Sequence, residues 1–189
     1  GAGMMRCGGL LWGNDVHTHW ASMRGGLEAI LFEAKDDQIR RGQTLSFLAA
    51  GYFLNQDYEA AVRYYREATE VLQMLPAVLS FSQACLASSL LRLHKLEEAA
   101  QVAEQATLTQ SLFDDGGPYA AAVWLVRAET HFALGEESQG LVVLRRAVTL
   151  LRLRLAQAPS EERRQMLKNA VVQHRELQQL CTSRLGEEV

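Results

Sequence analysis

The chain has 189 residues, of which 48% are hydrophobic, and its formal net charge is −3. This length and composition suit one globular unit or one short solenoid. The small net charge argues against a nucleic-acid module, which needs a basic face for phosphate contacts, and no run approaches the ~20 apolar residues of a membrane span. The three cysteines fit neither a disulfide framework nor a zinc motif, so we expect an intracellular protein in the cytoplasm, with the nucleus as the open alternative.

Residues 1–26 differ from the rest of the chain. Gly1-Ala2-Gly3 before Met4 is typical of an expression scar, and residues 4–26 hold five glycines together with Trp12 and Trp20. Because glycine weakens helices and strands alike, we predict an irregular arm here, with at most one helical turn near residues 17–23. Two interpretations stay open: the arm covers one end of the fold, or it lies in a groove of the same or a neighbouring molecule.

Helical periodicity begins after the arm. Residues 27–34 predict a short helix, and Asp37 is placed to cap the next one over residues 38–54. A second helix follows over residues 58–75, and Asn55-Gln56-Asp57 separates the two. The apolar positions of this pair are Leu45, Leu48, Ala49 and Tyr52, then Tyr58, Ala61, Val62, Tyr65 and Ala68. The small residues fall where two antiparallel helices approach most closely.

Two further copies of this pattern follow. The second uses Leu86, Ala87 and Leu90, then Leu96, Ala99, Ala103 and Ala106; the third uses Trp124 and Ala128, then Gly140, Leu144 and Ala147. After the break at Pro159, Ser160 is a plausible N-cap for a last helix over residues 161–184, which carries one apolar stripe. We expect this helix to cover the apolar face of the third pair.

The signature resembles the tetratricopeptide repeat (TPR) family, in which it extends over ~34 residues. The spacings here, 38 residues from Ala61 to Ala99 and 41 from Ala99 to Gly140, are longer and resemble the long-helix branch seen in kinesin light chains and Pins-type spindle adaptors. The resemblance implies an all-α fold, an α-solenoid of about three TPR helical hairpins. Residues 27–184 would form the domain, with repeats at about 42–75, 80–113 and 121–157, a capping helix at 161–184, and a tail at 185–189.

The resemblance also implies a binding surface, because the first helix of each TPR pair lines the concave face. The implied groove residues are Gln43, Ser46, Ala50, Phe53, Phe81, Cys85, Ser88, Arg92, Ala122, Val126 and Glu129. These residues are mostly small and apolar, with single polar groups. Such a surface favours a mainly apolar helical or extended segment of a partner protein. Phe53 and Phe81 have a second interpretation, as ordinary packing residues.

The sequence shows no phosphate loop, nucleophile elbow or Cys-His-Asp constellation. The only local histidine cluster, His17-Thr18-His19 near Asp15, lies in the Gly-rich arm and falls short of a full ligand set. We therefore predict no catalytic residue, no metal and no cofactor. The predicted function is a non-enzymatic protein-interaction scaffold or adaptor, with neither nucleic acid nor membrane as partner. One alternative is a dedicated chaperone that shields one client protein; another is an enzyme or regulatory subunit with a metal in the arm.

Overall fold

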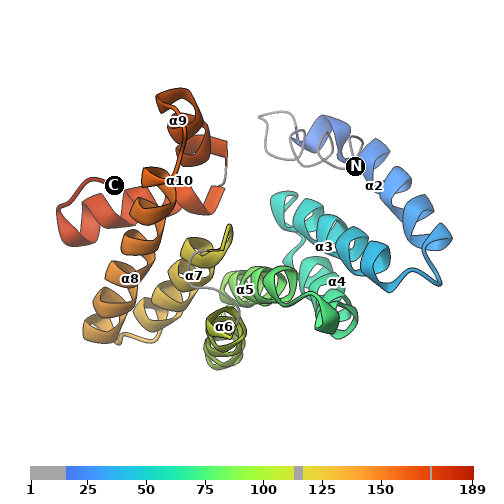
Figure 1. The fold of residues 1–189 in the computed structure, drawn as a ribbon. Coiled ribbons are helices and arrows are strands. Elements are labelled where there is room, and N and C mark those ends of the chain that lie inside the picture. Colours follow the sequence, from blue (N-terminus) through green and yellow to red (C-terminus); the bar gives the residue numbers. More distant parts are fainter. Residues whose placement is uncertain (1–15, 113–116, 171) are drawn as a thin grey trace.

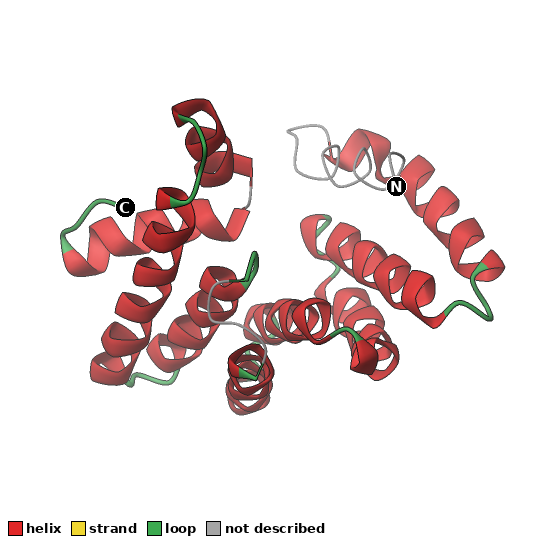
Figure 2. Ribbon diagram, viewed as in Figure 1, coloured by secondary structure: helices red, strands yellow, loops and turns green. Residues whose placement is uncertain are grey.

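The structure is a computed structural model that describes residues 16–112, 117–170 and 172–189. Within these ranges every regular element is helical. Figure 1 shows the helices following one another along an arc, so that α10 faces α3 across its inner side. Figure 2 shows the same arrangement as helices joined by short loops. The all-α prediction is confirmed, and none of the helices in the described ranges is both long and apolar enough to cross a membrane.

Three helix pairs form the body of the arc, as predicted. They are α3 (Gln38–Leu54) with α4 (Tyr58–Val71), α5 (Pro76–Arg92) with α6 (Leu96–Ser111), and α7 (Ala120–Ala133) with α8 (Glu137–Ala156). A short 3₁₀ turn, η1 (Leu72–Met74), leads from the first pair to the second. Pro76 opens α5, where its missing N–H is not needed. Asp37 and Asp57 cap α3 and α4 by accepting from the backbone N–H groups of Arg40 and Ala60, each at 3.0 Å.

The turn inside each pair has the same backbone design. Its middle residue has a positive φ: 63° at Gln56, 56° at His94 and 76° at Gly135. The next N–H donates back to a carbonyl five residues earlier, from Asp57 to Tyr52 at 2.9 Å, and the other two turns repeat this bond. Successive left-handed residues are 38 and 41 positions apart, which are the spacings of the sequence pattern. The repeat is therefore visible in the backbone as well as in the side chains.

The core lies between the helices of each pair. Ala49 and Ala61 are both fully buried in one cluster with Ala99, at the position where a larger side chain would separate the helix axes. Tyr65 packs beside them and is 4% exposed. The third pair is closed in the same way at Gly140, because a Cβ there would lie 2.4 Å from the Phe132 ring. Small residues at these positions let the helices approach closely enough for dense packing.

The prediction of an irregular arm is wrong for residues 16–26. They form the first part of α2 (Val16–Glu33), a helix that includes Gly25 and Gly26. The helix predicted over residues 27–34 is the second part of α2. The burial of Trp20 and Leu27 against α3 supplies the stabilisation, which outweighs the cost of about 1 kcal/mol for each helical glycine. Trp20 lies over the α-carbon of Gly51 and meets Tyr52 edge to face at 5.0 Å. Residues 1–15 lie outside the described residues, and both interpretations of their docking stay predictions.

The prediction of a single capping helix over residues 161–184 also needs correction. The structure has two helices, α9 (Glu161–Ala170) and α10 (Val172–Leu180), followed by a π-helical turn, η2 (Cys181–Leu185). Ser160 caps α9 as predicted, accepting from the Arg163 N–H at 3.1 Å. The chain then changes direction and lays Leu177 and Cys181, both fully buried, against the apolar face of α7 and α8. A straight helix would carry these side chains away from that face, and their burial favours the break.

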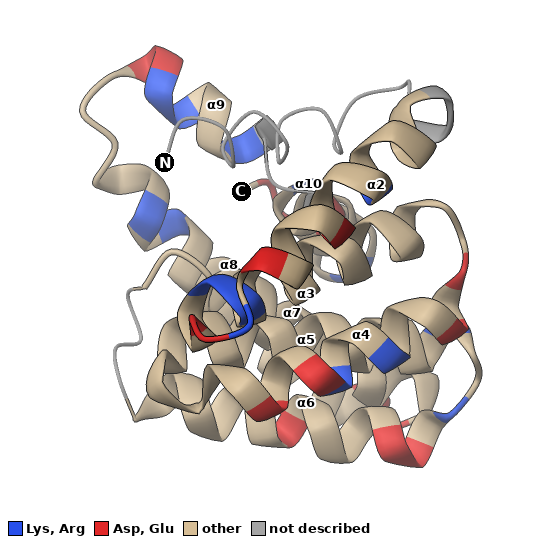
Figure 3. Cartoon of the chain, turned by 90° about the vertical axis from the view of Figure 1, so that its right-hand side faces the viewer, with Lys and Arg blue, Asp and Glu red and all other residues tan. Residues whose placement is uncertain are grey.

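Many of the charged residues lie on the outside of the arc. Figure 3 shows acidic residues on α6 and basic residues on α9. Pairs such as Arg66 with Glu98 and Arg127 with Glu104 join helices of neighbouring repeats. These partners are exposed or partly exposed, so each pair adds at most about 1 kcal/mol to stability. The outer surface is thus an ordinary charged surface, and the inner side of the arc differs from it.

Candidate partner-binding groove

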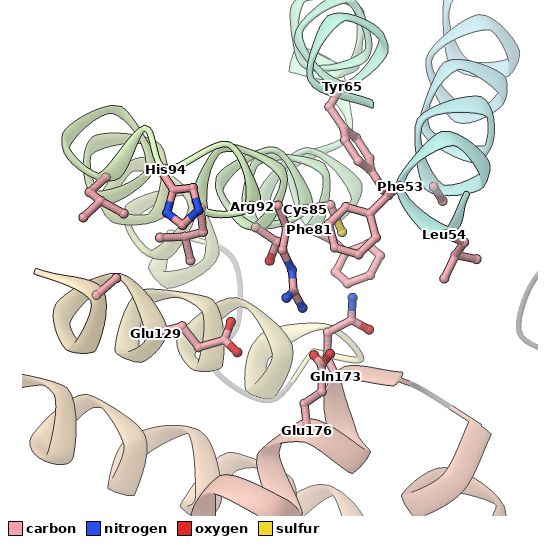
Figure 4. Close-up of a pocket in the computed structure, with 15 residues that line it drawn as sticks. Phe53, Leu54, Tyr65, Phe81, Cys85, Arg92, His94, Glu129, Gln173 and Glu176 are labelled. Atoms are coloured by element: carbon pink, nitrogen blue, oxygen red, sulfur yellow. The ribbon is translucent and has the colours of Figure 1, made fainter. Parts of the chain in front are cut away.

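A pocket of about 500 Å³ opens on the inner side of the arc. We call it the groove, and its lining residues are Ala50, Phe53, Leu54, Tyr65, Phe81, Cys85, Ser88, Leu91, Arg92, His94, Leu96, Glu129, Ala133, Gln173 and Glu176. All three helix pairs contribute to the lining, and α10 supplies the last two residues. Figure 4 shows this arrangement, with α10 facing α3 and α5 across the pocket.

One side of the groove is apolar and aromatic. Phe53, near the end of α3, meets Tyr58 edge to face at 5.3 Å, and Phe81, on α5, stacks on Tyr119 at 4.5 Å. Both phenylalanines are half-buried, so each ring is held from behind and still presents surface to the pocket. Rings fixed in this way offer contact area at little entropic cost on binding.

Cys85 and Tyr65 lie at the base of this aromatic side. Burial raises the pKa of the Cys85 thiol to about 12, and the nearby Glu176 carboxylate acts in the same direction, while a hydrogen bond with Tyr65 opposes the shift. Burial likewise raises the pKa of Tyr65 well above its usual value. Both groups therefore stay neutral at physiological pH. A protonated thiol is a poor nucleophile, so Cys85 acts here as a small apolar wall residue.

The opposite side of the groove is charged. The Arg92 side chain points toward Glu129 on α7 and toward Gln173 and Glu176 on α10 (Figure 4). Burial, together with the neighbouring Glu176 carboxylate, raises the pKa of the Glu129 carboxyl to about 8, and Arg92 opposes this shift. Burial also raises the pKa of Glu176, against Arg92 and Arg175. A single lining arginine thus faces two carboxyl groups.

The groove contains most of the residues predicted from the sequence. Ala50, Phe53, Phe81, Cys85, Ser88, Arg92 and Glu129 all line it. Their role in binding a partner stays a prediction. The remaining predicted residues, Gln43, Ser46, Ala122 and Val126, do not line it.

Three of those four residues have other contacts. The Ser46 hydroxyl lies 3.0 Å from the Ser82 hydroxyl and links α3 to α5. Ala122 and Val126 are only 1% and 2% exposed, and Val126 packs with residues of α5 and α6, so the prediction that they form an open groove wall is wrong. The third pair packs closely on the second at this point, and this buries the first part of the α7 face that the resemblance assigned to the groove, whereas Glu129, farther along the helix, still lines it.

No feature of the sequence indicated the wall formed by α10. Gln173 and Glu176 are one helical turn apart, but polar residues at that spacing are common on any exposed helix face. Leu54 could have been found, since it follows Ala50 by four residues, which places both on one face of the helix. No group of three or more histidine, cysteine, aspartate or glutamate residues is placed to hold a metal among the described residues. Asp15 lies outside the described residues, and His17 and His19 lie in the first turn of α2.

Comparison with known proteins gives the fold. No family model matches the chain, and no curated protein has a matching sequence. Two solved structures of TPR-like repeats from a kinesin light chain protein of Podosopora anserina are similar. One is 19% identical with a TM-score of 0.62, covering 97% of this chain and 93% of that chain. The other is 20% identical with a TM-score of 0.60, covering 96% and 97%. The chain therefore has a TPR-like helical repeat fold.

Proposed function

We propose that this chain is a protein-interaction scaffold whose groove binds a mainly apolar helical or extended segment of a partner protein. The groove itself carries the proposal, because it spans three repeats and combines a large volume with two aromatic rings fixed from behind. Concave, mostly apolar sites with a few placed polar groups are the usual form of a binding site. The neutral Cys85 thiol on its wall supports binding as the activity in preference to covalent catalysis.

We also propose that the chain is a divergent member of the long-helix branch of the TPR family. The 38- and 41-residue spacings of its turns support this, as does the 20-residue length of α8. The spacing exceeds the ~34 residues of the plain repeat, and the extra length lies in helices and connections. Longer helices widen the inner side of an arc, which leaves room for a folded or extended segment.

The test compares three forms of the protein in affinity capture from native lysate, followed by mass spectrometry. They are the wild type, a Phe53→Glu/Phe81→Glu variant, and a Phe32→Glu control. Phe32 is 70% exposed and lies outside the groove, so the control makes the same kind of substitution, with one added charge in place of two, without changing the site. Circular dichroism establishes that each form is folded.

A partner captured by the wild type and the control, but lost from the groove variant, is then mapped to a segment. Calorimetry on the synthetic segment should show a negative heat-capacity change on binding, because apolar surface is buried. A partner that binds all three forms equally refutes the groove as the site and moves the interface to another surface of the arc.

A further inference from the structure

We propose that the groove selects a partner segment that carries a basic side chain, arginine or lysine, opposite its apolar anchor. The apolar anchor contacts Phe53 and Phe81, and the basic group lies between Glu129, Gln173 and Glu176. This inference rests on the proposed function and specifies the partner it serves. Its occupant is a basic amphipathic segment of another protein.

The charges of the groove favour a cation. Its lining contains two carboxyl groups, from Glu129 and Glu176, and one arginine, Arg92, while His94 lies on the turn between α5 and α6. Arg92 acts on both carboxyl groups, so its single charge is divided between them. A carboxylate held close to a second carboxylate in a partly buried site is destabilised, and an added cation relieves that repulsion. An acidic segment would add a third carboxyl group to the same place.

The hydrogen-bonding groups give the same preference. The side-chain oxygen of Gln173 is buried and has no hydrogen-bond partner in the part of the chain that the structure describes. A buried acceptor left without a donor costs about 1–3 kcal/mol. Guanidinium and ammonium groups are donors only, so either would satisfy this oxygen, once a rotation of the Gln173 side chain exposes it to the groove, together with a carboxylate oxygen. A carboxylate from the partner would leave the Gln173 oxygen without a donor.

The positions of the two walls define the shape of the occupant. Figure 4 shows Phe53 and Phe81 on the α3 and α5 side, and Glu129, Gln173 and Glu176 on the α7 and α10 side, with Arg92 between them. A segment lying in the groove therefore presents an apolar face to one wall and its basic side chain to the other. A segment that is apolar on all sides would bury the carboxyl groups of the second wall without pairing them, which is costly.

The experiment uses a phage-displayed library of random linear peptides selected against the whole chain. Peptides that also bind the Phe53→Glu variant are discarded, which leaves the groove-dependent set. The same selection is run on a Glu129→Gln/Glu176→Gln variant, which keeps the shape of both side chains and removes both charges. The matched control is Glu97→Gln/Glu162→Gln, because these exposed glutamates lie outside the groove lining.

We expect arginine and lysine to be enriched in the groove-dependent peptides of the wild type and the control, and to lose that enrichment with the Glu129→Gln/Glu176→Gln variant. Replacing the basic residue of one selected peptide by glutamine should weaken its binding to the wild type about tenfold or more. Groove-dependent peptides without basic enrichment overturn the charge inference and leave the proposed function standing. A library that yields no groove-dependent peptide overturns both.

Discussion

The contact between Trp20 and Gly51 predicts that one added methyl group will weaken the attachment of α2. A Cβ at Gly51 would lie 1.9 Å from the Trp20 ring, so the ring must move if Gly51 becomes alanine. Trp20 is only 6% exposed and is held by Tyr52, so it has little room to move within the core. The variant Gly51→Ala should therefore destabilise the protein although alanine favours helices.

The size of the effect follows from the area at stake. A tryptophan buries about 150–250 Å² on folding, and at about 25 cal/mol per Å² its full release costs about 4–6 kcal/mol. The higher helix propensity of alanine relative to glycine offsets about 1 kcal/mol of this cost. A partial shift of the ring, typical of overpacked cores, costs about 1–3 kcal/mol. We expect a net loss of about 1–3 kcal/mol in the free energy of unfolding.

Chemical denaturation followed by circular dichroism measures this loss against a matched control. Gly25→Ala is the same substitution in an exposed part of α2, where a Cβ meets nothing within 4 Å, and it should raise stability by about 0.5–1 kcal/mol. In a Trp20→Ala background, Gly51→Ala should cease to destabilise. If Gly51→Ala is as stabilising as Gly25→Ala in the wild-type background, Trp20 does not lie over Gly51 and the packing of α2 described above is refuted.

Three further predictions concern the repeats and the groove. Gly140→Ala should cost about 1–3 kcal/mol because its Cβ would lie 2.4 Å from the Phe132 ring, and an unchanged unfolding midpoint would contradict that packing. Gln56→Gly should raise the free energy of unfolding by up to about 1 kcal/mol, whereas Gly135→Ala should lower it by a similar amount, since both positions have a positive φ; denaturation curves shifting in the same direction would refute the shared turn design. Because folding raises the pKa of Glu129 from its ordinary 4.5 to about 8, the folded state binds the extra proton between these values, so stability should fall as pH rises from about 4.5 to about 8, by at most about 1.4 kcal/mol per pH unit. Glu129→Gln should remove that part of the slope, and melting curves with an unchanged pH dependence would count against the burial of this carboxyl.

The repeats could be predicted from the sequence because the information that defines them is local. Ala49 and Ala61 lie on apolar stripes at helical spacing, and both are fully buried where the stripes meet. Asp37 and Ser160 are polar residues just before such stripes, and both accept the expected backbone hydrogen bonds. Periodicity and capping depend on residues a few positions apart, so they can be recognised without knowing the contacts between distant segments.

What could not be predicted depends on contacts between distant segments. Helix α2 contains Gly25 and Gly26, whose local preference is against a helix, and it is stabilised by a tryptophan that packs on another helix. Ala122 and Val126 are buried on α7, where Val126 packs against residues of α5 and α6, and no local pattern in the sequence indicates that packing. The same holds for α10, whose position beside the groove follows from the burial of Leu177.

The position of α10 across from α3 changes how the whole arc responds to an occupant. In a stack of repeats each unit contacts only its neighbours, so motions at the two ends are weakly coupled. A segment bound between Phe53 and Glu176 would contact the first repeat and the C-terminal helices at the same time. Moving either end of the repeat array away would then require breaking contacts with the same bound segment. Hydrogen exchange should consequently slow at α3 and α10 together when the groove is filled, because the bound segment couples the two ends of the repeat array.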